Sequence, residues 1–479
     1  MNARPQTSLT ESSLFHRRDL IRVGSVAFAG SVLGGWDDAF ATGRAPKVDG
    51  KAKQVIFLWM GGGVTHIDSF DPKPLAPESI RGTLNAIPTA LPGVQFGEPM
   101  PHLARMATDL CVVRSYSHDS NDHLQSQAYT LSGRKVNRSE LFKHPNIGSI
   151  FSYLFGPRNG LPGYIAVPGI TRPGPPPNNL FVGGWLGNRY APFAVGGQPE
   201  QPDFTKGPNL ANPNGYLEET LMPKALTFPR DVDRRRLKKR AGLLQRLEAT
   251  VKSADAARPA ADMGGHYESA MNLLTSPKVR GAFDLSQEPR KLRDEYGRTK
   301  IGSRCLQARR LIEAGARFVM VDYGYDPDYG NIWDNHNAAS QSHPPIMKMV
   351  TRPYHLAGID KSFAALIGDL KHRGLLAGTL VVFLTEFGRT PKINKRGGRD
   401  HWGACGSIFF TGGGTKTGQV IGASDKHAAH PTTKSYTPAD IAATIYGAVG
   451  LDLEHVVYDV QNRPWRLLTD GKAIDGVLG

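Results

Sequence analysis

Short runs of apolar residues, each bounded by polar residues, recur along this 479-residue chain and predict the strands of a buried sheet. A strand covered on both faces forms a continuous apolar run, whereas a strand with one solvated face alternates between apolar and polar residues. Two shorter runs, 407–411 and 418–421, are typical of closing strands, and the glycine-rich residues between them favour a hairpin. The four longer runs lie at residues 54–60, 110–116, 317–322 and 380–384.

Helical patterns separate the strands and indicate how they are connected. Residues 302–314 show helical spacing of apolar positions, Gly315 terminates them, and the strand at 317–322 follows at once. This succession is half of a strand–helix–strand unit, which places consecutive strands parallel. The sequence therefore predicts an α/β fold with a mainly parallel sheet. Further helices are expected at 124–131, 359–372 and 438–449.

Polar residues gather where four of the predicted strands end. In open α/β sheets, ligands bind outside the carboxyl ends of the strands, so these positions are candidates for chemistry. Carboxylates and imidazoles are also common ligands of divalent metals. The four polar strand ends are 61–71 with His66 and Asp68, 117–123 with His123, 334–336 with Asp334 and His336, and 386–401 with Glu386 and His401.

The last of these strand ends is the richest in charge. It holds Glu386, Arg389, Arg399, Asp400 and His401. Two carboxylates and an imidazole at this spacing suit a divalent metal. The alternative is a set of loop salt bridges, Glu386 with Arg389 or Arg399 with Asp400, that hold no ligand.

The chain is basic, and this favours anionic partners. It has 58 Lys and Arg residues against 43 Asp and Glu residues, which gives a net charge of +15 and a pI near 9.6. Such a charge attracts phosphate or sulfate esters, acidic glycans, surfaces or nucleic acid. The charge is spread along the chain and no nucleic-acid-binding motif occurs, so nucleic acid is not an expected partner.

The first 41 residues resemble an export signal and are set aside from the fold. The arginine pair at 17–18 is followed by a short apolar stretch at 23–36 and an Ala-Phe-Ala cleavage candidate at 39–41. The apolar stretch is too short and too rich in glycine to span a membrane. We therefore expect a twin-arginine signal peptide at 1–41 and a periplasmic or extracellular protein without a membrane span.

Several motifs resemble the bacterial family called domain of unknown function 1501 (DUF1501). The most specific are EFGRTP at 386–391 and GGRDHW at 397–402, and DSFDPKP at 68–74 adds to them. The resemblance implies a branch of the alkaline phosphatase/sulfatase superfamily, with a mainly parallel sheet sandwiched between helices and a one- or two-metal site at the strand ends. The expected organisation is an alkaline-phosphatase-like domain at 50–455, a Pro- and Gly-rich insertion within it at about 157–280, and a C-terminal tail at 456–479.

The superfamily pattern transfers to this chain only in part. The superfamily nucleophile, a Ser, Thr or modified Cys, would fall at His123, so the resemblance implies that His123 is either a replacement nucleophile or a metal ligand. The paired Asp and His of the superfamily align with Glu386 and an apolar residue. Asp334 and His336 keep the order of aspartate then histidine, and His401 matches the last metal histidine.

The first functional hypothesis is an exported, metal-dependent hydrolase of sulfate or phosphate esters. It would hold one or two Zn, Mn or Ca ions and act on a small anionic ester or on a sulfated or phosphorylated glycan. Gathering of the candidate residues around one pocket would favour this hypothesis. The expected metal ligands are His66, Asp68, Asp334, His336, Glu386 and His401, the catalytic residues are His123 and Arg389, and the anion-binding residues are Lys73 and Arg399.

The second hypothesis is a non-catalytic protein of the same fold that binds a glycan, a surface or a partner protein. The missing nucleophile motivates it. Dispersal of the candidate ligands would favour it, as would an aromatic-lined groove built from Trp59, Trp185, Trp333 and Trp402.

Overall fold

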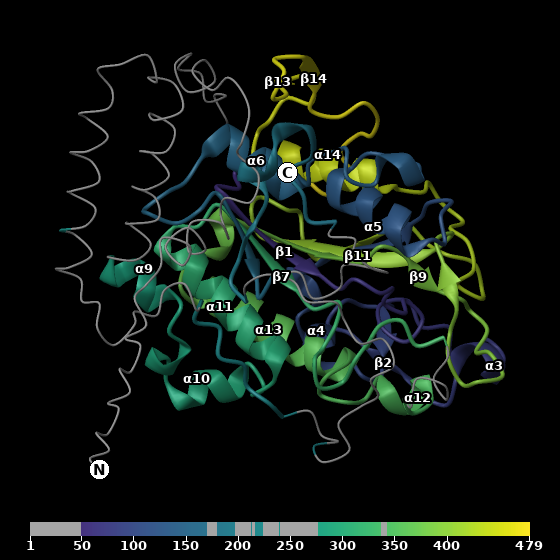
Figure 1. The fold of residues 1–479 in the computed structure, drawn as a ribbon. Coiled ribbons are helices and arrows are strands. Elements are labelled where there is room, and N and C mark those ends of the chain that lie inside the picture. The colour runs from purple at the N-terminus through teal and green to yellow at the C-terminus, as the bar shows by residue number, and fades with distance from the viewer. Residues whose placement is uncertain are drawn as a thin grey trace, which may run out of the picture.

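An eight-stranded sheet forms the centre of the described part of the chain (Figure 1). Its order is β12-β4-β11-β8-β1-β7-β5-β6, and its pairs are parallel except for those that β11 makes with β4 and β8. The predicted α/β fold with a mainly parallel sheet is therefore confirmed. The strands are β1 (Gln54–Trp59), β4 (Cys111–Tyr116), β5 (Tyr164–Val167), β6 (Phe193–Ala194), β7 (Phe318–Asp322), β8 (Thr379–Leu384), β11 (Gly406–Thr411) and β12 (Gln419–Ile421).

The computed structural model describes only part of the chain. The predicted signal peptide and most of the predicted insertion lie outside the described residues. Among the helices that are described, none has the length and apolar character needed to cross a bilayer. The described residues are 49–169, 180–196, 212, 216–223, 239, 276–336 and 343–479.

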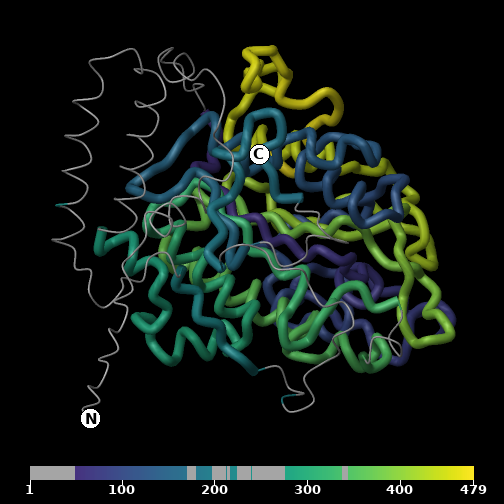
Figure 2. The backbone as a smooth tube through the Cα atoms, viewed as in Figure 1, coloured from purple at the N-terminus to yellow at the C-terminus, as the bar shows by residue number. Residues whose placement is uncertain are grey.

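Helices cover both faces of the sheet (Figures 1 and 2). Alternate residues of each strand enter two different cores: Ile56 and Leu58 of β1 lie in one, and Val55 and Phe57 lie in the other. This two-sided burial explains the continuous apolar runs. The helices are α3 (Glu78–Arg81), α4 (Pro101–Arg105), α5 (His123–Ser132), α6 (Ile147–Phe155), α9 (Pro277–Ala282), α10 (Arg290–Glu295), α11 (Lys300–Ala314), α12 (Ile346–Met349), α13 (Leu356–His372) and α14 (Pro438–Ala448).

The predicted helices agree with α5, α11, α13 and α14 to within a few residues, and the end signals of α11 and α14 are real caps. Gly315 ends α11 in the left-handed conformation, with φ of 112°. Thr437 and Asp440 form a capping box at the start of α14. The predicted hairpin at 407–421 is wrong. Strand β4 lies between β11 and β12 and pairs with both of them.

The C-terminal residues pack onto the same core as the sheet. Strands β13 (Val456–Tyr458) and β14 (Pro464–Arg466) form a separate antiparallel pair. Beyond them, Ile474 and Val477 are buried in the cluster that contains the inner residues of β1 and β8. Within the predicted insertion, β5 is a strand of the main sheet.

One edge of the sheet collects the strand ends that carry polar residues. Strands β1, β7 and β8 are parallel neighbours. Because β11 is antiparallel to both β4 and β8, β4 runs in the same direction as β8. The carboxyl ends of all four strands therefore lie at the same edge, as the sequence predicts. A short antiparallel pair, β9 (Gly388–Arg389) and β10 (His401–Trp402), follows β8 there.

Candidate metal centre

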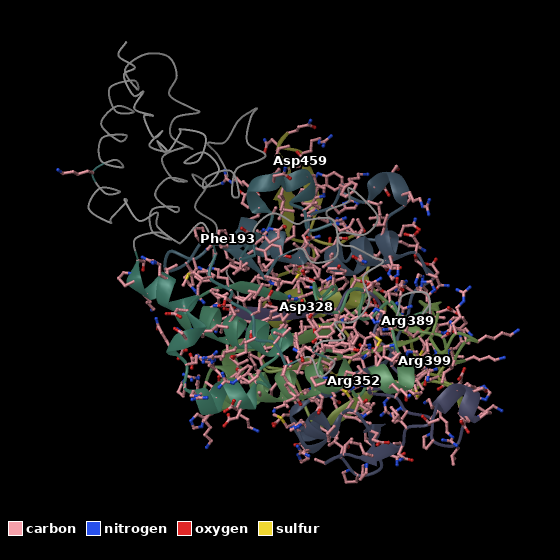
Figure 3. The ribbon with its side chains drawn as sticks, turned by 60° about the horizontal axis from the view of Figure 1, so that its bottom comes forward. Phe193, Asp328, Arg352, Arg389, Arg399 and Asp459 are labelled. Carbon is pink, nitrogen blue, oxygen red and sulfur yellow. The ribbon has the colours of Figure 1, made fainter. Side chains whose placement is uncertain are left out.

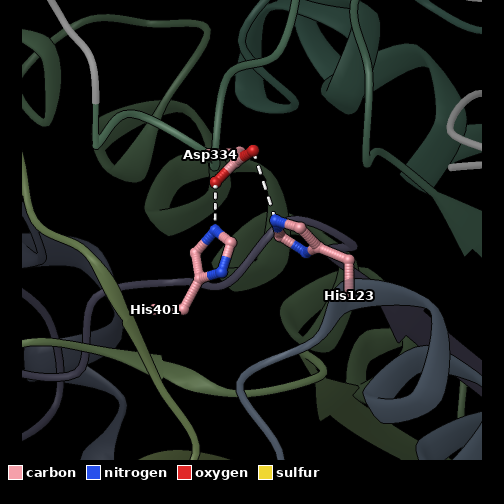
Figure 4. Close-up of side chains that lie close together, drawn as sticks. All are labelled: His123, Asp334 and His401. Carbon is pink, nitrogen blue, oxygen red and sulfur yellow. Dashed lines mark hydrogen bonds and ion pairs between the residues drawn. The ribbon is translucent and has the colours of Figure 1, made fainter. Parts of the chain in front are cut away.

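Three side chains from distant parts of the chain, His123, Asp334 and His401, meet at this edge (Figure 4). The Nε2 atom of His123 lies 3.2 Å from Oδ2 of Asp334, and Nε2 of His401 lies 2.9 Å from Oδ1 of Asp334. The centroids of the two imidazole rings are 4.2 Å apart. Among the residues that the structure describes, this is the one group of three or more His, Cys, Asp or Glu whose ligand atoms lie within 4.8 Å of one another.

Each of the three residues is placed by a different segment. His123 is the first residue of α5, where Asp122 caps the helix by accepting a backbone hydrogen bond. Asp334 lies in the segment between β7 and α12. His401 begins β10 and lies opposite Arg389 of β9. The group therefore forms only when the segments that follow β4, β7 and β8 come together.

The contacts of His401 call for a proton or a cation between its ring and Asp334. Its Nδ1 lies 2.9 Å from the carbonyl oxygen of Asn121, which can only accept a hydrogen bond, so Nδ1 carries the hydrogen. In a neutral ring, Nε2 then presents a lone pair to a carboxylate oxygen at 2.9 Å. Two acceptors at this distance repel each other unless a proton or a metal ion lies between them.

His123 lies between two carboxylates, and its contacts also call for a proton or a cation next to Asp334. Its Nδ1 is 2.9 Å from Oε1 of Glu386, and its Nε2 faces Asp334. Donation from Nδ1 to Glu386 selects the tautomer whose Nε2 is free of hydrogen. A carboxylate behind an imidazole is the usual support of a metal-binding histidine. The Nε2 atoms of both rings are thus turned toward one aspartate.

Glu386 is completely buried and holds His123 from behind. Its two carboxylate oxygens each lie 2.7 Å from the backbone nitrogen of Gly62, which donates to them, and Nε2 of Gln127 lies 3.4 Å from Oε1. Its carbonyl oxygen accepts a hydrogen bond from the hydroxyl of Tyr116. The structure therefore places Glu386 outside the group of three, against one member of it.

Replacement of Glu386 by Gln is expected to weaken metal binding about 10- to 100-fold, because the amide removes the charge that orients and polarises His123. Titration of metal-free protein with Zn²⁺ or Mn²⁺ measures this loss directly. Glu454→Gln is the matched control, since the Glu454 side chain is 68% exposed and pairs with Arg466. Equal affinities of wild type and Glu386→Gln would contradict the positioning role.

Arg389 fixes the carboxylate of Asp334. Its Nη2 lies 2.8 Å from Oδ1 of Asp334, and its Nε donates to the carbonyl oxygen of Gly63 at 2.9 Å. When protons rather than a metal ion lie between the imidazoles and Asp334, burial raises the pKa of Asp334, but the charges of protonated His123 and of Arg389 and the hydrogen bonds from both imidazoles outweigh burial and hold this pKa well below its usual range. The Arg389 side chain is 1% exposed, so it positions Asp334 rather than facing a ligand.

His336 lies at the rim of the group. Its Nε2 is 3.8 Å from Oδ1 of Asp334, and its ring centroid is 5.1 Å from that of His401. Its side chain is 33% exposed, more than that of any of the three central residues. Burial lowers the pKa of His336, although the charge of Asp334 opposes this. The structure brings His336 beside the group but not into it.

The other four predicted site residues lie outside the group of three, and their charged or polar atoms contact other parts of the chain. Arg399 donates from Nε and Nη2 to the two carboxylate oxygens of Asp68, each at 2.8 Å. Lys73 pairs with Asp71 at 2.9 Å, and Nε2 of His66 lies 2.8 Å from a backbone carbonyl oxygen. These charges neutralise one another within the chain, and none of the four belongs to the group of three. The four residues are His66, Asp68, Lys73 and Arg399.

The alternatives that the sequence left open fare differently. The sequence left open salt bridges between loop neighbours, Glu386 with Arg389 or Arg399 with Asp400. Instead, Arg389 pairs with Asp334 and Arg399 pairs with Asp68. An exposed aromatic groove is also not supported at two of its proposed positions. Trp59 and Trp333 are each 1% exposed and belong to the two cores.

Two supporting groups were not identified from the sequence. Gln127 contacts Glu386 and lies four residues after His123, so helical spacing could have placed it on the same face of α5. Asn121 contributes its backbone carbonyl to His401. A backbone contact of this kind leaves no signal in residue type.

The residues of the group fit a divalent metal ion. A tetrahedral zinc ion bound at about 2.0–2.2 Å would hold its ligand atoms about 3.3 Å apart, close to the separations of 2.9 and 3.2 Å seen between the imidazole nitrogens and Asp334. Two imidazoles and one carboxylate suit Zn or Mn, whereas Ca prefers six to eight oxygen ligands. An ion here would also relieve the facing lone pairs described above.

Comparisons with known proteins identify a family and a set of distant structures. A family model described as "Protein of unknown function (DUF1501)" matches residues 52–478. A comparison with curated proteins found no significant match.

Several solved structures show a distant likeness to this chain. The phosphonate monoester hydrolase SpPMH from Silicibacter pomeroyi is 13% identical, with 88% of this chain and 76% of that chain covered and a TM-score of 0.33. The PsFucS1 sulfatase from Pseudoalteromonas sp. is 14% identical, with 84% and 68% covered and a TM-score of 0.31. The lipoteichoic acid synthase LtaP from Listeria monocytogenes is 10% identical, with 90% and 78% covered and a TM-score of 0.31.

Proposed function

Because the chain belongs to the DUF1501 family, whose description assigns no function, we propose its function from the site itself: a metal-dependent hydrolase of an anionic sulfate or phosphate ester. The observation that carries the proposal is the pair of imidazoles whose Nε2 atoms both face Asp334. We propose further that the chain acts outside the cytoplasm after twin-arginine export, on the sequence evidence of residues 1–41.

The residues divide into those that would hold the ion and those that support them. His123, Asp334 and His401 would bind one divalent ion, with Zn or Mn preferred over Ca. A bound divalent ion supplies a Lewis acid that stabilises the negative charge developing on the oxygens of the ester. Glu386 orients His123, and Arg389 keeps Asp334 ionised and in place.

The arrangement favours His123 as a ligand rather than as the nucleophile. Both of its ring nitrogens already contact carboxylates, one at 2.9 Å and the other at 3.2 Å. A nucleophilic histidine needs a ring nitrogen that faces the substrate. We therefore propose that water attacks the phosphorus or sulfur atom of the ester while the bond to the alcohol oxygen breaks, which releases the alcohol and phosphate or sulfate. His336, at the exposed rim, is the imidazole placed to exchange a proton with the attacking water.

The direct test is metal analysis of the purified full chain together with a substrate screen. We expect about one Zn or Mn per chain, with loss of turnover on chelation and recovery on addition of the same metal. Turnover of nitrophenyl phosphate, bis-nitrophenyl phosphate or nitrophenyl sulfate identifies the substrate as a phosphate monoester, a phosphate diester or a sulfate ester. The variant His401→Gln should lose both metal and turnover. His372→Gln, on the exposed end of α13, should lose neither.

The same measurements of metal content and turnover test the non-catalytic hypothesis. Absence of both bound metal and turnover on all three esters would leave a family member that binds without reacting. Metal without turnover on small esters would retain the metal centre and direct the search to larger substrates.

A further inference from the structure

Asn331 is a buried residue that contacts Asp334 of the metal centre. It lies three residues before Asp334, in the segment between β7 and α12, and it is 3% exposed. Its side-chain nitrogen donates to Oδ2 of Asp334 at 3.2 Å. A direct hydrogen bond to the carboxylate allows Asn331 to affect how that carboxylate is oriented.

The charge of Asp334 determines which way round the Asn331 amide lies. An ionised carboxylate can only accept hydrogen bonds, so the amide atom that faces it must be the nitrogen. The amide oxygen then points elsewhere, and within the described part of the chain it accepts no hydrogen bond. Burial of a carbonyl oxygen without a donor costs free energy. Asn331 therefore combines one useful contact, from its nitrogen, with one unfavourable buried atom, its oxygen.

Each oxygen of Asp334 has one contact with an imidazole and one contact with a supporting side chain. Figure 4 shows the two imidazoles facing separate oxygens. Oδ1 lies 2.9 Å from Nε2 of His401 and accepts from Nη2 of Arg389, labelled in Figure 3, at 2.8 Å. Oδ2 lies 3.2 Å from Nε2 of His123 and accepts from Asn331.

Two donors restrict the rotation of the Asp334 carboxylate more than one donor does. The bond between a carboxylate and its Cβ has broad rotational preferences, so the side chain itself does not fix the plane of the two oxygens. Arg389 holds one oxygen and Asn331 holds the other. Together they keep a free lone pair of each oxygen turned toward the imidazoles.

We propose that Asn331 is a positioning residue of the metal centre, which holds Oδ2 of Asp334 in the orientation that the bound ion requires. This inference rests on the proposed function, because the ion is the one that His123, Asp334 and His401 would hold. The alternative is a purely local role, in which Asn331 stabilises the bend at 331–333 and has no effect on the metal.

The variant Asn331→Ala is expected to weaken Zn²⁺ binding about tenfold, at the lower end of the range for groups that support a metal ligand, because the amide carries no charge. The substitution also removes the oxygen that lacks a donor, so the Tm of the metal-free protein should change by less than about 2 °C. Asn331→Leu, which leaves no cavity, should lose the same affinity. Titration of metal-free full chain with Zn²⁺, well below the Tm of each variant, measures the affinity.

Asn85→Ala is the matched control. The side-chain nitrogen of Asn85 also donates to a carboxylate oxygen at 3.2 Å, but the acceptor is the exposed Glu98, which is not a member of the group of three. This variant should bind Zn²⁺ as wild type does. The absorption spectrum of bound Co²⁺, which reports the arrangement of the ligands, should change in Asn331→Ala and stay the same in Asn85→Ala.

The possible outcomes separate this inference from the proposed function. Wild-type Zn²⁺ affinity and an unchanged Co²⁺ spectrum in both Asn331 variants would overturn the positioning role and leave the metal centre standing. A lower Tm of the metal-free variants without any loss of affinity would assign Asn331 to the local bend and overturn the role as well. Failure of wild type to bind Zn²⁺ would refute the proposed function, and the inference with it.

Discussion

A chain with Asp334→Asn is expected to bind no stoichiometric divalent metal and to lose roughly 1,000-fold or more of kcat/KM. Asp334 is the residue toward which both His123 and His401 turn their Nε2 atoms. An amide at this position removes the negative charge and replaces one ligand oxygen with a hydrogen-bond donor. Metal analysis and turnover on the best ester from the screen measure the two effects.

The same substitution should also lower the free energy of unfolding, by about 3 kcal/mol. Arg389 is buried against Asp334 and would keep its charge while losing its anionic partner. Its remaining hydrogen bonds to backbone carbonyls, such as that of Gly63, keep the loss at the lower end of the range for broken buried pairs. Denaturant unfolding of the metal-free proteins measures this difference.

Metal-dependent stabilisation separates loss of the site from general damage. At free metal 100 times its Kd, wild type should gain about 2.7 kcal/mol of stability, and the variant should gain none. Asp400→Asn is the matched control, because Asp400 precedes His401 and its side chain is 54% exposed. It should keep the metal and change stability by less than about 0.5 kcal/mol. If Asp334→Asn bound metal as wild type does, the centre would have to lie elsewhere.

The strands could be predicted from the sequence where burial on both faces leaves an unbroken run of apolar residues. Strands β1 and β8 are covered on both faces, and their unbroken apolar runs record this directly. The pairing of β12 was not accessible in this way. A glycine-rich connection favours a hairpin locally, yet the backbone nitrogen of Gly418 donates to Leu110 O and directs the chain along β4 instead. The competing partner is more than 300 residues away in sequence.

For the candidate site too, the sequence predicts the location of the polar strand ends but not the pairing of their side chains. The sheet topology brings the carboxyl ends of β1, β4, β7 and β8 to one edge, as the sequence predicts. Which carboxylate pairs with which cation depends on contacts between distant segments. Arg399 neighbours Asp400 in sequence but pairs with Asp68, 331 residues away. A ligand and a structural ion pair therefore look alike in the sequence, and only the three-dimensional arrangement distinguishes Asp334 from Asp68.

Because Asp68 forms a buried ion pair with Arg399, its replacement should have a large effect on stability. Asp68→Ala is expected to lower the free energy of unfolding by about 3–5 kcal/mol, because it leaves the Arg399 guanidinium buried without its carboxylate. Arg399 is 1% exposed and donates to Asp68 through two hydrogen bonds of 2.8 Å. The hydroxyl of Thr65 also donates to Asp68, at 2.7 Å. Denaturant unfolding measures the loss.

Removing both partners should cost less than the two single changes together, since no charge is then left buried alone. The double variant Asp68→Leu, Arg399→Met tests this in a thermodynamic cycle. Metal content must be measured on the same samples under conditions in which they stay folded. A structural ion pair predicts unchanged metal stoichiometry in the single and double variants. Loss of metal from a stably folded Asp68→Ala protein would instead return Asp68 to the ligand set and require the loop after β1 to move toward His123.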